Sequence, residues 1–260
     1  MADGADARSW QRAWRELVDR LLRVESEDGK RQLLDQLAMP SRPTVLAFVN
    51  AHAMNSAASS PHFFQALRSA DIVLRDGSGM AILLKLLARQ PGLNLNGTDL
   101  IPAILRRYDG RPIALFGTQE PYLSSARDTV RRTFAPQSQC IAASGFLPTS
   151  DYLALAASHA PALIVLGMGM PRQEEVAREL RAALHHPCLI VCGGAIIDFM
   201  GGKTSRAPRW VRAVGMEWLY RLGLEPRRLF KRYVLGNPLF VARALRLAAS
   251  GAPADAGQAG

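Results

Sequence analysis

Short apolar runs recur through the middle of the chain and alternate with stretches of helical periodicity. The runs lack the in-and-out alternation of a half-exposed strand, which is typical of parallel strands covered on both faces. They predict six strands: Thr44–Val49, Ile72–Leu74, Pro112–Phe116, Gln139–Ala142, Ala162–Leu166 and Cys188–Val191. The helices predicted between them are Met80–Arg89, Asp99–Tyr108, Tyr122–Thr133, Tyr152–Ser158 and Gln173–Leu184. This order predicts an α/β fold, a doubly wound and mostly parallel sheet in a Rossmann-like three-layer sandwich.

Helical patterns also flank the predicted sheet. An apolar stripe near the N-terminus predicts an amphipathic helix that packs on the body: Trp10, Trp14, Leu17 and Leu21. After residue 202 the pattern is helical only and predicts two helices, Pro208–Leu222 and Arg227–Ala249. We therefore expect an N-terminal helical extension (1–40), a Rossmann-like core (41–202), a C-terminal helical appendage (203–250) and a disordered tail (251–260).

The positive charge is concentrated in the predicted appendage. The chain has 260 residues and a formal net charge of +10. Between Lys203 and Arg246, eleven lysines and arginines face only Glu217 and Glu225, so this segment carries +9 of that charge. Such a basic region suits an anionic partner: phospholipid head groups, a diphosphate or nucleic acid.

Other features limit the class of protein. No uncharged apolar segment reaches the roughly 18 residues that span a bilayer, and we expect no secretion signal at the N-terminus. Cys188 and Cys192 are interpreted as small buried hydrophobic residues, because their spacing is not that of a zinc site. The low number of cysteines fits a reducing compartment best. The chain has no Asp-x-Asp pair to hold a divalent cation on a diphosphate, so we expect no metal and no other cofactor.

Candidate chemistry is sought where the predicted strands end, because open parallel sheets bind ligands at the carboxyl ends of their strands. Polar residues and glycines stand there in six places: Asn50, Asp76-Gly77, Gly117-Thr118, Gly145-Phe146, Gly167–Glu174 and Gly193-Gly194 with Asp198. Two interpretations of Asp76 stay open: it forms a turn or caps a helix N-terminus, or it acts as a general base. The Gly167–Glu174 segment is either a tight structural turn or a phosphate-binding turn into a helix. Arg172 stands where a dinucleotide fingerprint has its third glycine, which disfavours NAD.

Together these motifs resemble the WecG/TagA/CpsF glycosyltransferases (glycosyltransferase family 26) over about Asn50–Tyr233. The resemblance rests on motifs in the same order: Asn50-Ala51, Ala70–Leu74 with Asp76–Gly79, Gly97–Leu100, Gly167–Glu174, Gly193–Ala195 with Asp198, Arg206–Pro208 with Trp210, Glu217–Leu219, Arg221-Leu222 and Glu225–Arg228. It implies inverting, metal-independent transfer of a hexose or N-acetylhexosamine from a UDP-sugar to a sugar on a polyprenyl diphosphate. Exopolysaccharide or cell-surface polymer biosynthesis is the implied destination.

The resemblance also implies roles for residues. Asp76 is the implied catalytic base, and Gln173 and the Gly167–Gly169 turn are expected to hold the donor. Further substrate-binding residues are expected at Asn50, His52, Gly77, Asn96, Asp99, Gly117, Thr118, Gly145, Phe146, Gly167, Gly169, Pro171, Glu174, Gly194 and Asp198. Arginines of the appendage are expected to contact the diphosphate and an anionic membrane surface: Arg206, Arg221, Arg227, Arg228 and Arg232. We expect a cytoplasmic protein, peripheral on the inner face of the cell membrane, and a homo-oligomer is left open.

Two positions depart from the family pattern. Phe48 stands where relatives commonly have Thr, and Asn94 stands where they often have Arg. These changes bear on the identity of the sugar, and they leave a catalytically inactive scaffold as an alternative. The basic helices leave a second alternative, a nucleic-acid-binding α/β protein, although nucleic acid is not among the partners we expect. Aromatic residues among the arginines suit either a membrane interface or packing of the appendage on the core: Trp210, Trp218, Tyr220, Phe230 and Tyr233.

Overall fold

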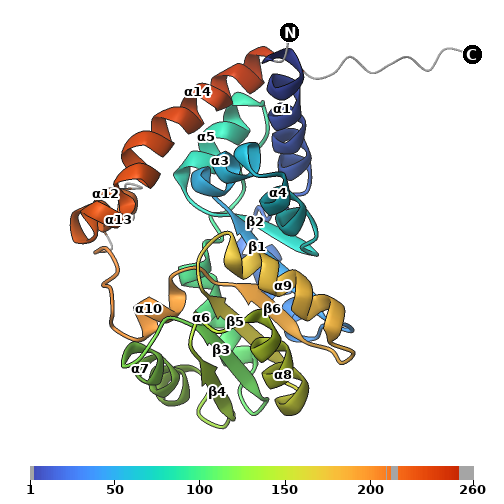
Figure 1. Ribbon diagram of the computed structural model, residues 1–260, viewed down its shortest axis with the longest axis vertical. Helices are drawn as coiled ribbons and strands as arrows, with labels where there is room; N and C mark the ends of the chain where they lie inside the picture. Colours follow the sequence, from blue (N-terminus) through green and yellow to red (C-terminus); the bar gives the residue numbers. More distant parts are fainter. Residues whose placement is uncertain (1–2, 209, 212–215, 252–260) are drawn as a thin grey trace, which may run out of the picture.

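The computed structural model describes residues 3–208, 210–211 and 216–251; apart from Gly251, the expected disordered tail lies outside these residues. Six parallel strands form one sheet with helices on both faces, which confirms the predicted α/β fold (Figure 1). The strands are β1 (Thr44–Val49), β2 (Ile72–Arg75), β3 (Ile113–Gly117), β4 (Cys140–Ala143), β5 (Leu163–Gly167) and β6 (Leu189–Cys192). Their spatial order is β2-β1-β6-β5-β3-β4. The prediction placed every strand end within a residue or so.

Helices cover the sheet from both sides. One apolar layer involves α3 (Ala51–Ser59), α4 (Pro61–Arg68), α5 (Ser78–Leu86), α8 (Thr149–His159) and α9 (Arg172–Ala183). The opposite layer involves α2 (Glu27–Ala38), α6 (Gly97–Arg107), α7 (Tyr122–Thr129) with its π-helical continuation η1 (Val130–Phe134), and α10 (Ile196–Met200). The short helices α3 and α4 follow β1 directly and were not predicted from periodicity.

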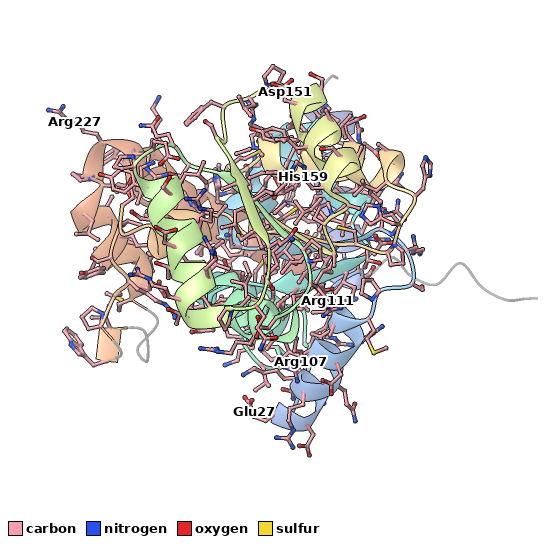
Figure 2. The ribbon with its side chains drawn as sticks, turned by 90° about the horizontal axis from the view of Figure 1, so that it is seen from below. Glu27, Arg107, Arg111, Asp151, His159 and Arg227 are labelled. Atoms are coloured by element: carbon pink, nitrogen blue, oxygen red, sulfur yellow. The ribbon has the colours of Figure 1, made fainter. Side chains whose placement is uncertain are left out.

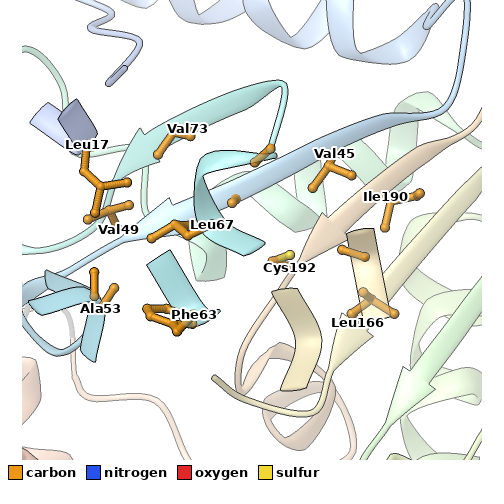
Figure 3. Packing of buried hydrophobic residues seen from close by; sticks show 14 of the residues in the cluster. Leu17, Val45, Val49, Ala53, Phe63, Leu67, Val73, Leu166, Ile190 and Cys192 are labelled. Atoms are coloured by element: carbon orange, nitrogen blue, oxygen red, sulfur yellow. The ribbon is translucent and has the colours of Figure 1, made fainter. Parts of the chain in front are cut away.

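Alternation along each strand divides the core between these two layers. Val45 and Val49 of β1 belong to the first layer, whereas Leu46 of the same strand belongs to the second. Figure 3 shows Val45 and Val49 on the face that Phe63 and Leu67 of α4 cover. Each fully buried side chain of this size contributes about 1.5–3 kcal/mol to folding. Cys188 and Cys192 are buried free thiols, as predicted.

The N-terminal helix α1 (Asp3–Asp19) packs on the body, as its apolar stripe predicts. Trp14 is fully buried, and its indole nitrogen donates a hydrogen bond to the Met54 carbonyl at 2.7 Å. Its ring lies 5.3 Å, centroid to centroid, from that of Phe240 in the last helix, α14 (Gly236–Ala249). Arg15 donates to the Leu247 carbonyl at 3.3 Å, near the end of α14. The first and last helices are therefore joined, and they meet at one end of the molecule in Figure 1.

The appendage consists of α12 (Glu217–Leu224), α13 (Pro226–Phe230), the π-helical turn η2 (Lys231–Leu235) and α14. Of the predicted helix from Pro208 to Leu222, Trp210 and Val211 are helical, and its last part is the start of α12, which runs to Leu224. Arg209 and residues 212–215 lie outside the described residues. The second predicted helix is present as the consecutive α13, η2 and α14.

Polar contacts fix the appendage to the core. The Asn55 side chain donates to the Gly236 carbonyl at 2.7 Å and accepts from Arg243 at 3.1 Å. Phe240 approaches Gly79 so closely that a Cβ there would stand 3.4 Å from the ring. Within the described residues, no helix is both long enough and apolar enough to cross a bilayer.

Candidate functional site

A sharp turn after β2 places the carboxylate of Asp76 at the carboxyl end of the sheet. The Asp76 amide donates to the Val49 carbonyl of the neighbouring strand at 2.8 Å. Gly77 follows with a φ of 88°, and no atom lies within 4 Å of the place where its Cβ would be. Glycine adopts this backbone conformation without strain. The turn therefore presents the carboxylate beside open space.

Asn50 holds the Asp76 carboxylate. Its side-chain oxygen accepts from the Ala53 amide at 3.0 Å and so caps the N-terminus of α3. This bond turns the amide nitrogen toward Asp76, to which it donates at 3.4 Å. Burial raises the pKa of the Asp76 carboxyl above its ordinary value, while Asn50, Arg232 and Arg221 act in the opposite direction with smaller effect.

A second layer of contacts supports the turn. Arg75 is buried and donates to the carbonyls of Pro91 at 2.8 Å and Gly92 at 2.6 Å. Asn94 accepts from the Gly77 amide at 2.9 Å. Arg75 and Asn94 therefore fix the Asp76-Gly77 turn to the loop before α6, and Asn94 has a definite structural partner at the position where relatives often have Arg.

Asp76 lines a pocket of about 320 Å³ between the sheet edge and the appendage. Four further predicted residues of the core line it: Asn50, His52, Gly77 and Asn96. Burial, followed by the charge of Arg232, lowers the pKa of His52 to about 4, so this imidazole is neutral at pH 7. The pocket is therefore built from both the core and the appendage.

Arg221 and Arg232 are the two predicted arginines that line this pocket. The Nε atom of each is buried and has no hydrogen-bond partner among the described residues. Burial lowers the pKa of Arg232, and the neighbouring positive charge of Arg221 lowers it further. Buried donors without partners are unfavourable, and guanidinium groups bind phosphate with charge-assisted hydrogen bonds. This pair is suited to an anion that enters the pocket.

The other predicted arginines have different surroundings. Arg206 forms an ion pair with Asp99 at 2.6 Å, so these two predicted residues meet each other beside α6. Arg228 pairs with Glu225 on the surface of α13. Arg227 points away from the body at the edge of the molecule (Figure 2). Their roles toward a diphosphate or a membrane stay predictions.

A second group of predicted residues gathers at the ends of β3, β5 and β6. A Cβ on Gly117 would stand 2.5 Å from the Gly167 carbonyl oxygen, and one on Gly145 would stand 3.0 Å from Gly117. These three glycines allow close backbone packing. Thr118 donates to the Asp198 carboxylate at 2.6 Å. The remaining members lie on the same side: Gly169 and Gly194 with positive φ, Pro171 before α9, and Phe146, which is 71% exposed.

Gln173 and Glu174 are buried at the start of α9 rather than exposed to the Asp76 pocket. The Gln173 side chain accepts from the Gly194 amide at 2.9 Å and donates to Glu174 at 2.8 Å. Burial raises the pKa of Glu174 to about 7, and its second carboxylate oxygen has no partner among the described residues. Gln173 thus holds the loop after β6, and its predicted part in catalysis stays a prediction.

Several pocket residues were not predicted as site residues. Trp218, Tyr233, Asn237 and Phe240 of the appendage line the Asp76 pocket, although two of them were noted as aromatics among arginines. Phe48 does not line it, because its ring is buried against Gly97 in the core. Trp210 is 73% exposed. Sequence spacing alone could not show which face of the appendage turns toward Asp76.

A larger hollow of about 1000 Å³ lies between α1, α5 and the end of α14, and no predicted site residue lines it. Among the described residues, no group of three or more His, Cys, Asp or Glu side chains is arranged to hold a metal ion.

Open parallel sheets bind ligands at the carboxyl ends of their strands, where this pocket lies, and the two arginines that line it are suited to a phosphate group. The sequence matches the model of the glycosyl transferase WecG/TagA/CpsF family over residues 20–252. The chain belongs to this family, as its motifs indicate. It is 27% identical over 194 residues, 73% of this chain and 74% of the relative, to the N-acetylglucosaminyldiphosphoundecaprenol N-acetyl-beta-D-mannosaminyltransferase of Bacillus spizizenii.

Proposed function

We propose that this protein is an inverting glycosyltransferase that moves a hexose or N-acetylhexosamine from a UDP-sugar to a sugar on a polyprenyl diphosphate. The observation that carries the proposal is the pocket that Asp76, Arg221 and Arg232 line together. The relative from Bacillus spizizenii, whose name describes an acceptor with a diphosphoundecaprenol group, supports this substrate class.

Asp76 acts as the general base in the proposed reaction. Its carboxylate takes the proton from an acceptor hydroxyl, and the hydroxyl oxygen forms a bond to the anomeric carbon of the donor. The bond between that carbon and the diphosphate oxygen breaks, and UDP leaves from the opposite face. The raised pKa of Asp76 strengthens the carboxylate as a base. The hydrogen bond from Asn50 orients it.

The glycine turns after β3, β5 and β6 form the proposed donor side of the site. Gly169 and Gly194 have open space where a Cβ would be, so a diphosphate can approach the backbone there. Gln173 holds Gly194 in place through its side-chain oxygen. In this proposal Gln173 acts by positioning the loop that receives the nucleotide.

The appendage is the proposed contact with the membrane. Its basic residues each contribute about 1 kcal/mol when they lie near an anionic leaflet. Two apolar side chains that lie between these basic residues in the sequence are exposed as well: Phe230 by 51% and Leu235 by 59%. Exposed apolar side chains beside arginines and lysines suit the interface of a lipid surface. We therefore place the enzyme on the inner face of the cell membrane as a peripheral protein.

The test incubates purified protein with a panel of UDP-sugars and a polyprenyl-diphosphate-sugar acceptor, without added metal, and follows UDP release and glycolipid formation. Asp76→Asn should lower the rate by about 10²–10⁴-fold, the usual contribution of a general base, while UDP binding stays unchanged. Asp151→Asn, an exposed position on α8, is the matched control. Absence of both product and UDP binding would overturn the proposal.

A further inference from the structure

An apolar groove of about 740 Å³ lies on the appendage beside the Asp76 pocket. It runs between α12 with η2 and α14, and it is lined by Leu219, Val234, Ala242 and Leu245, among others. Leu219 of α12 is 46% exposed, and Leu245 of α14 is 52% exposed. Exposed apolar surface gathered in a groove marks a binding site more often than isolated apolar side chains do.

The groove and the pocket share a wall. Trp218, Tyr233, Asn237 and Val241 line both. The Trp218 and Tyr233 rings are 5.9 Å apart, centroid to centroid, so two aromatic side chains stand together at this boundary. A ligand that fills the pocket can therefore continue directly into the groove.

Charge changes abruptly along this path. Arg221 and Arg232 line the pocket, whereas no charged residue of the described chain lines the groove. A ligand that matches both has an anionic group followed immediately by a hydrocarbon chain. A lipid-linked diphosphate has this form, because its first isoprene unit is bonded to the phosphate that the arginines would bind.

We propose that the groove binds the isoprene units nearest the diphosphate of the polyprenyl acceptor. This inference rests on the proposed function and adds a hydrocarbon subsite to it. The enzyme holds the first units of the chain on protein surface, while the rest of the chain stays in the bilayer. The lipid thereby helps to place the acceptor sugar beside Asp76.

The test removes the bilayer from the assay. Soluble acceptors carry the same sugar diphosphate with no tail, or with one, two or three isoprene units, in buffer without vesicles. For the unmodified protein, KM should fall about tenfold for each of the first units, because every unit brings five carbons into partial burial. Saturation should follow once the groove is full.

Three variants separate the groove from the general apolar surface. Ala242→Trp fills the groove at an exposed position, and Leu245→Gln makes its far end polar. The control is Leu239→Gln, a residue of the same helix that is 46% exposed and does not line the groove. The two groove variants should flatten the dependence on tail length and leave KM for the tailless acceptor unchanged. The control should keep the full dependence.

Two outcomes would refute the groove as a binding site for isoprene units and leave the proposed reaction unaffected. One is turnover of all four acceptors with equal KM, and the other is a tail dependence that Ala242→Trp and Leu239→Gln change equally, as insertion into a lipid surface would. A binding measurement needs no turnover: farnesyl diphosphate should bind more tightly than inorganic diphosphate, and Ala242→Trp should abolish the difference. Equal binding of the two compounds would refute the subsite even if the enzyme proved inactive.

Discussion

Replacing Glu174 by Gln should stabilise the protein, and the gain should grow with pH. Glu174 is 2% exposed, and burial raises the pKa of its carboxyl from 4.5 to about 7. At about 1.4 kcal/mol for each pKa unit, ionisation in the folded protein is about 3 kcal/mol less favourable than in the unfolded chain. Gln keeps the shape and can accept the same hydrogen bond from Gln173, but it never ionises.

The free energy of unfolding changes with pH because the folded and unfolded states lose the Glu174 proton at different pH. Below pH 4.5 Glu174 is protonated in both states, and burial carries no charge penalty. As the pH rises toward 7, the unfolded chain ionises first and binds fewer protons than the folded protein. The free energy of unfolding therefore falls with pH over this window, and the loss is complete above pH 7.

Urea unfolding followed by tryptophan fluorescence measures this difference. The variant should be more stable than the unmodified protein by about 1 kcal/mol at pH 5 and by about 3 kcal/mol at pH 8. Glu179→Gln removes the same formal charge from the same helix at a half-exposed side chain and should show no such growth. A constant difference between pH 5 and pH 8 would refute the assignment of a buried, weakly acidic carboxyl to Glu174.

Four further predictions concern the site and its support. Activity should fall on acidification at a pH above that of an ordinary aspartate, because burial raises the pKa of Asp76. Asn50→Ser keeps the helix cap but loses the amide donor, and should move this fall to higher pH; an unchanged pH profile would contradict the contact. Arg232→Gln should raise KM for the diphosphate acceptor about 10- to 100-fold, given about 1.5–3 kcal/mol for a hydrogen bond to a charged group, whereas equal effects from exposed Arg227→Gln would count against diphosphate binding. Trp14→Ala should lower the free energy of unfolding, measured in urea, by about 3–5 kcal/mol, and a loss below about 1 kcal/mol would refute the tight burial of Trp14 between α1 and the core.

The sheet could be predicted because each of its strands has a clear signal in the sequence. A buried parallel strand is a short continuous apolar run, and β1 begins and ends where the run Thr44–Val49 does. Asp76 could be placed at the sheet edge for the same reason, since it directly follows such a run. The helices α3 and α4 were missed because Ser60, which ends α3 and caps α4, and Pro61 at the start of α4 interrupt the helical period between two short helices.

The appendage side of the pocket was beyond prediction from spacing. Arg221, Arg227 and Arg232 all lie in basic helical sequence, yet two of them line the pocket and Arg227 points to solvent. The π-helical turn η2 adds to the uncertainty, because it changes the faces on which later residues lie. The burial of Glu174 was equally hidden, since its neighbour Glu175 is partly exposed on the same helical turn.

The contact between α1 and α14 joins segments that are made at very different times during synthesis. Arg15 and Leu247 are 232 residues apart in the chain, so the first helix leaves the ribosome long before its partner exists. Domains generally fold from the N-terminus as they are made, yet the wall of the Asp76 pocket that contains Phe240 is synthesised long after Asp76 itself. A nascent chain or a C-terminally truncated fragment therefore carries the Asp76 carboxylate without its closed pocket. A chain that stops before α14 also leaves the face of Trp14 that packs on Phe240 uncovered.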